Sequence, residues 1–114
     1  ESELMKKVKL LPENVAVYSN EPNVVAFVTG RRTRDIPMKI HPLNRSPWDG
    51  YQGEIARMEE NLTRGAVLVW FNSVKRNNYA SLEEMKQAMQ LVSLDKAADG
   101  AIYGIRQGPS KSKS

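Results

Sequence analysis

The segment over residues 15–32 constrains the fold more than any other part of the chain. Residues 15–19 are apolar and rich in β-formers, which predicts a short buried strand. Asn20 is a suitable N-cap and Pro22 suits the first helical position, so an apolar helix follows, and Gly30 ends it. Because this helix is apolar almost all round, we expect it to be mostly buried. A strand, a tight turn and a helix make up the repeating unit of parallel α/β sheets.

The rest of the chain alternates helical and extended patterns. Helical spacing of apolar residues covers residues 4–11, 49–63 and 81–89, and short β-rich runs cover 35–40, 66–71, 91–95 and 101–106. Pro37 lacks an N–H for a ladder, so its run is an edge strand or is irregular, whereas the apolar run 66–71 predicts a central strand. Asp99 and Gly100 are typical of a hairpin turn.

These patterns predict the α/β class. We expect a single three-layer domain over residues 1–107, with a mostly parallel sheet of about five strands that ends in a C-terminal antiparallel hairpin. Residues 108–114 are polar and predict a disordered tail. The first residue is Glu1 rather than Met, so we expect a fragment of a longer protein.

Composition limits the chemistry that this chain can perform. It has no cysteine and one histidine, His41, which excludes disulfides, thiolate metal sites, cysteine nucleophiles and multi-histidine metal sites. We therefore expect no metal and no cofactor. The net charge of +4 favours an anionic partner, but 13 acidic residues are interspersed among 17 basic ones, which argues against a nucleic-acid surface.

Two groups of residues could bind an anion. Ser19 and Asn20 lie in a turn at the carboxyl end of a strand, where phosphates and sugar hydroxyls often bind. Helix capping explains the same residues, and we favour it because the turn has no glycine-rich loop and Glu21 would repel an anion. Arg31 and Arg32 could supply guanidinium donors, although cations after a helix also bond its last carbonyls. Arg31 is the first residue to test.

Aromatic residues suggest a second kind of site. Trp48 and Tyr51 lie in a loop and could stack on a sugar ring, although packing on the sheet is the favoured interpretation; Trp70 lies in the central strand and is expected in the core. The run over residues 75–79 contains two cations and a tyrosine, and we interpret it as a solvated loop.

An acid–base set is the remaining alternative. Asp35, His41, Asp49 and Glu54 match no catalytic template in their spacing, so we assign no catalytic residue.

Several short motifs together resemble one protein family. The segment Leu-Pro-Glu-Asn-Val-Ala-Val-Tyr-Ser-Asn-Glu-Pro is followed by Phe-Val-Thr-Gly-Arg and Ile-Pro, and later by Ala-Val-Leu-Val-Trp-Phe, Lys-Arg-Asn-Asn-Tyr, Ser-Leu-Glu-Glu and Asp-Gly-Ala-Ile-Tyr-Gly-Ile. In this order they resemble the C-terminal region of GT-C type multi-pass membrane glycosyltransferases, the group of the dolichyl-phosphate-mannose protein mannosyltransferases. The likeness covers roughly residues 3–106.

The resemblance implies a function for the whole protein. Enzymes of this group transfer a sugar from a polyprenyl-phosphate donor, and the acidic catalytic residue lies in a loop near the first membrane helices, outside this chain. The resemblance therefore implies a non-catalytic domain on the extracytoplasmic face of the membrane. Its partners would be the membrane-embedded part of the same polypeptide and a polyprenyl-phosphate sugar or glycan acceptor. The alternative is a free-standing α/β module that binds a nucleotide or another anion at the Asn20 turn and Arg31.

Overall fold

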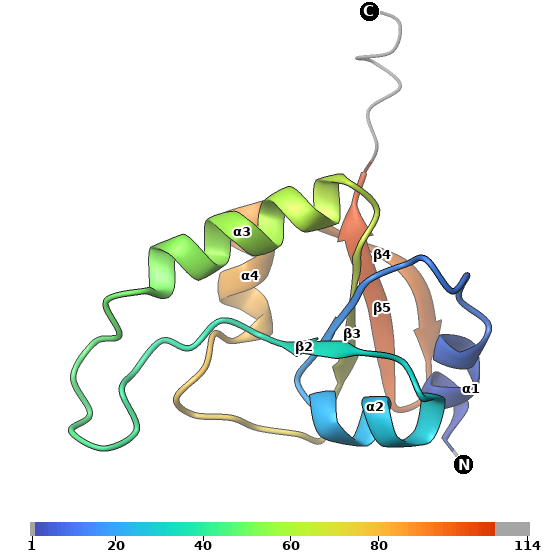
Figure 1. The fold of residues 1–114 in the computed structure, drawn as a ribbon, viewed down its shortest axis with the longest axis horizontal. Coiled ribbons are helices and arrows are strands. Elements are labelled where there is room, and N and C mark those ends of the chain that lie inside the picture. Colours follow the sequence, from blue (N-terminus) through green and yellow to red (C-terminus); the bar gives the residue numbers. More distant parts are fainter. Residues whose placement is uncertain (1, 107–114) are drawn as a thin grey trace, which may run out of the picture.

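In residues 2–106, five strands form one mixed sheet at the centre of the fold (Figure 1). The structure, a computed structural model, describes residues 2–106, so the predicted tail over 108–114 lies outside the described residues. The strand order is β2–β1–β3–β5–β4, with bounds β1 Val17–Ser19, β2 Thr33–Asp35, β3 Val67–Phe71, β4 Leu91–Ala97 and β5 Gly100–Ile105. β1 pairs in parallel with β2 and β3, whereas β5 pairs antiparallel with β3 and β4.

Four helices of the described part of the chain pack against this sheet. They are α1 Glu3–Lys9, α2 Pro22–Thr29, α3 Tyr51–Thr63 and α4 Leu82–Met89. Local signals in the sequence place some of their ends correctly. Pro22 opens α2, and Gly30 ends it in the left-handed conformation at φ 73°. Ser81 and Glu84 form a reciprocal capping box at the start of α4.

Alternating side chains of the central strands contribute to two apolar clusters. Tyr18 and Leu68 belong to one cluster, together with buried residues of α3 and α4. Val17, Val67 and Val69 belong to the other, together with buried residues of α1 and α2. This alternation follows from the two-residue period of a strand and leaves both faces of the central strands covered.

The predicted α/β class, the central position of the 66–71 strand and the C-terminal hairpin are confirmed. The sheet is mixed, with two parallel and two antiparallel strand pairs, and the three-layer packing stays a prediction. The edge strand is β2, which shares only Asp35 with the predicted strand over 35–40, so that strand is wrong and the alternative of an irregular segment there is confirmed. Beyond β2, the chain leaves the sheet: the N–H groups of Lys39 and Ile40 donate to Asn78 of the β3–α4 loop.

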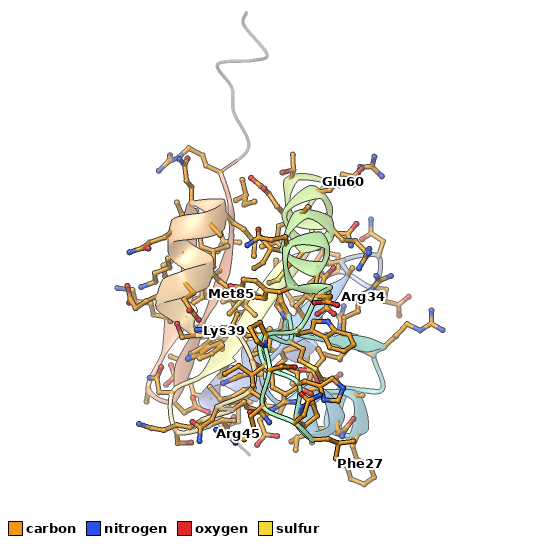
Figure 2. All side chains as sticks on the ribbon, turned by 90° about the vertical axis from the view of Figure 1, so that its left-hand side faces the viewer. Phe27, Arg34, Lys39, Arg45, Glu60 and Met85 are labelled. Carbon is orange, nitrogen blue, oxygen red and sulfur yellow. The ribbon has the colours of Figure 1, made fainter. Side chains whose placement is uncertain are left out.

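The expected burial of α2 is wrong for two of its large apolar side chains. Val25 is buried, but Val24 is 44% exposed and Phe27 is 90% exposed. α2 packs against α1, β1 and β2, and β2 is a three-residue edge strand. These neighbours cover one stripe of the helix, so the face with Phe27 points to solvent (Figure 2).

Candidate functional site

The turn after β1 is closed by its own hydrogen bonds. Asn20 is fully buried; its Nδ2 donates to the carbonyls of Phe71 at 3.0 Å and Val74 at 3.4 Å, and its Oδ1 accepts from the N–H of Phe71 at 2.9 Å. The N-cap of α2 is therefore Glu21, without a side-chain cap bond, and the prediction of Asn20 as the cap is wrong. Ser19, also fully buried, accepts from the N–H of Glu21 at 2.9 Å. The two side chains that we predicted as ligand groups are therefore bonded to the backbone of the protein itself.

A guanidinium beside this turn fixes the carboxyl ends of the parallel strands. Arg76 makes two hydrogen bonds to the Asp35 carboxylate, at 2.8 and 3.0 Å, and donates to the Asn20 carbonyl at 3.3 Å. Its guanidinium lies 3.9 Å from the centre of the Tyr79 ring. The bond to Asp35 raises the pKa of Arg76. We expected a solvated loop here, and no local pattern indicates a partner 41 positions away.

Arg31 and Arg32 line an open cleft of about 560 Å³ between the α1–β1 loop and the start of β2. The Arg31 guanidinium donates to three carbonyls of that loop: Leu11 at 2.6 Å, Pro12 at 3.0 Å and Val15 at 3.2 Å. These bonds stabilise the loop, and they also fix the position of the Arg31 guanidinium in the lining of the cleft.

The structure separates the two parts of the proposed anion site. Arg31 bonds to Val15, which precedes β1, whereas Asn20 follows the last residue of β1. The two side chains therefore lie at opposite ends of one strand, and this geometry does not support a single small ligand that contacts both of them.

Trp48 and Tyr51 lie together at a second open hollow of about 510 Å³. Its lining residues come from the loop between β2 and α3 and from the first turn of α3. Figure 1 shows that this loop extends away from the sheet. Ile40 and Pro47 complete the apolar part of its lining, and polar groups come from residues that include Lys39, Arg45, Asp49 and Gln52. Both aromatic rings are half-buried, so each combines packing with a surface open to a ligand.

A carboxylate on α3 fixes the indole at this hollow. Glu54 accepts from Trp48 Nε1 at 2.8 Å and, through its other oxygen, from the N–H of Met38 at 2.9 Å. Gly50 leaves room for the ring, since a Cβ there would come within 2.8 Å of Trp48 Nε1. The N-cap of α3 is Gly50 and not Asp49, so the predicted helix start is wrong by one residue. Sequence reasoning missed Glu54 and Gly50 as positioning residues.

One charged group at the hollow, Lys39, is paired. Lys39 forms a salt bridge with Glu84 of α4, and this bond raises the pKa of Lys39. The bond to Lys39 is the main reason why the pKa of the Glu84 carboxyl lies below its usual range, and the hydrogen bond from the N–H of Ser81 lowers this pKa further. Burial raises the pKa of the Tyr51 phenol, Glu84 adds to the rise and Lys39 opposes it. Tyr51 therefore keeps its O–H as a hydrogen-bond donor at neutral pH.

The titratable residues considered for catalysis have structural partners in most cases. Asp35 holds Arg76, Glu54 holds Trp48, and the Nδ1 of His41 accepts from the N–H of Leu43 at 3.3 Å. Asp49 is exposed. Within residues 2–106, no group of three or more histidine, aspartate or glutamate side chains could hold a metal ion.

Comparisons with known proteins add no assignment. No protein-family model, curated protein or solved structure matches the chain. In the part of the chain that the structure describes, no helix is both long and apolar enough to span a bilayer.

Proposed function

We propose that this chain is a non-catalytic accessory domain of a membrane glycosyltransferase that uses a polyprenyl-phosphate-linked sugar, and that it positions the glycan acceptor. The motif order over residues 3–106, which resembles the C-terminal region of these enzymes, supports the parent activity. The resemblance also supports a place on the extracytoplasmic face of the membrane. The acceptor role depends on one structural observation, the Trp48 hollow.

The chemistry of this hollow suits a sugar. A sugar ring has an apolar C–H face that packs on an aromatic ring, and a rim of hydroxyls that needs donors and acceptors. Trp48 and Tyr51 offer the aromatic surface, while Arg45, Asp49 and Gln52 offer polar groups of both kinds around it. Because Glu54 already holds the indole in place, little side-chain entropy is lost when a ligand binds.

Titration followed by NMR tests this proposal. The probes are short oligosaccharides of mannose, glucose and N-acetylglucosamine, at millimolar concentration. The protein has two indole N–H signals, from Trp48 and Trp70. We expect the Trp48 signal to shift with at least one probe and the Trp70 signal to stay in place, because Trp70 lies in the central strand.

A matched pair of variants checks the result. Trp48→Ala is expected to abolish the remaining shifts around the hollow. Phe27→Ala also removes an aromatic ring, but one that is 90% exposed and lies on α2, so it is expected to leave them unchanged. Absence of any sugar-dependent shift at Trp48, in a folded protein, would overturn the acceptor role.

The parent activity has a separate test. The gene sequence upstream of Glu1 is expected to encode several apolar segments of about 20 residues each, the length that spans a bilayer. A long hydrophilic upstream region would contradict the assignment to a membrane glycosyltransferase, whatever the sugar titration shows.

We also propose the three-layer packing for the fold. The support is the division of the buried residues, with those of α1 and α2 in one cluster and those of α3 and α4 in the other. An experimental structure with a helix layer on one face of the sheet only would contradict it.

A further inference from the structure

We propose that the cleft beside Arg31 is a binding site for a phosphate group. This cleft lies at the amino ends of β1 and β2, where the α1–β1 loop faces the segment that leads from α2 into β2. Its volume of about 560 Å³ exceeds what a phosphate needs and leaves room for an attached group. It shares no lining residue with the Trp48 hollow, so the inference goes beyond the proposed acceptor site.

The lining of the cleft is strongly cationic. Lys9, Arg31, Arg32 and Arg34 contribute four positive charges, and Glu13 is the one carboxylate among the lining residues. In the described part of the chain, no carboxylate forms an ion pair with any of the three arginines. Like charges gathered in a concave surface attract an anion, and arginine matches the oxygen geometry of a phosphate with two parallel N–H groups.

Arg31 gives this cleft a fixed donor group. A guanidinium has five N–H donors, and the three bonds to loop carbonyls leave two of them for a ligand. Its position is set before a ligand arrives, which lowers the entropic cost of binding. Arg32 and Arg34 are exposed, so their side chains can move to close on the same ligand.

A phosphate could reach the cleft as a soluble ester or as a lipid headgroup, and Phe27 distinguishes the two. Phe27 lies on α2, two and three residues before the cleft residues Thr29 and Gly30. In Figure 2, Phe27 and Arg34 lie toward the same side of the molecule, away from α4. An exposed aromatic ring beside a cationic site can enter the interface of a bilayer, but it contributes nothing to binding of a free phosphate.

The primary experiment measures inorganic phosphate binding through the backbone amide signals of residues 29–34. We expect saturable shifts there, and a loss of affinity of about tenfold in the double variant Arg32→Gln, Arg34→Gln. This variant leaves the Arg31 bonds to the loop intact, so the fold is preserved. The control is Lys75→Gln, Lys96→Gln, which removes the same charge from residues outside the cleft and is expected to change the affinity little.

Two results overturn the proposal: absence of saturable shifts in residues 29–34, or equal losses of affinity in the two double variants. Once phosphate binding is found, the source is identified with phosphatidylcholine vesicles that contain phosphatidic acid. A lipid headgroup predicts vesicle binding that weakens in Phe27→Ser while phosphate binding stays unchanged. A soluble phosphate ester predicts phosphate binding without vesicle binding.

Discussion

Replacement of Asn20 by alanine tests whether the turn after β1 is structural or a ligand site. The amide of Asn20 makes three hydrogen bonds to the end of β3 and the loop after it, and the side chain is fully buried. Alanine leaves the N–H of Phe71 without this acceptor and removes one donor from each of two carbonyls. An unsatisfied buried donor costs about 1–3 kcal/mol, and a carbonyl that loses one donor costs less, so we expect a total loss of about 2–3 kcal/mol.

Urea denaturation measures this loss directly. It is a large fraction of the stability of a typical small domain, roughly 5–15 kcal/mol, so the midpoint should fall clearly with an unchanged slope. Asn77→Ala is the matched control, because Asn77 is exposed in the β3–α4 loop, and a change within about 0.5 kcal/mol is expected. A loss below about 0.5 kcal/mol for Asn20→Ala as well would refute the structural role and return this residue to the ligand candidates.

Three further predictions concern the surroundings of the candidate sites. Gly50→Ala is expected to displace the Trp48 indole and weaken sugar binding, whereas Gly53→Ala, where a Cβ meets nothing within 4 Å, should leave sugar binding unchanged and stabilise α3 by about 0.5 kcal/mol. Sugar titrations measure the binding and urea denaturation measures the stability; equal sugar affinities in the two variants would show that Gly50 does not position the indole. The lowered pKa of Glu84 means that its salt bridge contributes stability above its ordinary value of 4.5 and loses it as the pH falls through the lower folded pKa. At low salt, the melting temperature of the original protein should therefore fall more steeply below pH 4.5 than that of Glu84→Gln, a variant that keeps the capping bond. Parallel curves for the two proteins would contradict a stabilising role of this salt bridge. Arg76→Lys keeps the charge but loses the two-bond contact with its carboxylate partner, so amide hydrogen exchange should become faster in β2; unchanged exchange there would show that the contact is not needed.

The sequence predicts the features of this fold whose partners lie close in the chain. The capping box joins Ser81 to Glu84, three residues away, and Gly30 ends α2 because of its own backbone freedom. Periodicity also identifies the central strand, since a long apolar run has no other stable place in a mixed sheet.

Features with distant partners could not be predicted in this way. Asn20 is an excellent N-cap by residue type, but its amide instead bonds to Phe71, which lies 51 positions away. Arg31 finds its carbonyl partners 16 to 20 positions away, and Arg76 finds its carboxylate 41 positions away. Only the folded sheet brings these groups together, so their roles could be assigned only from the structure.

The short edge strand β2 gives Arg34 two competing explanations. An exposed strand edge can pair with another molecule, and charged side chains on it prevent such pairing. Arg34 lies in the middle of β2 and is exposed, so it could protect the edge without binding any ligand. The two roles differ in their consequence. If Arg34 only protects the edge, the Arg32→Gln, Arg34→Gln variant should self-associate in sedimentation experiments while its monomer binds phosphate as the original protein does. If the cleft binds phosphate, affinity falls in the monomer itself, at protein concentrations where no self-association occurs.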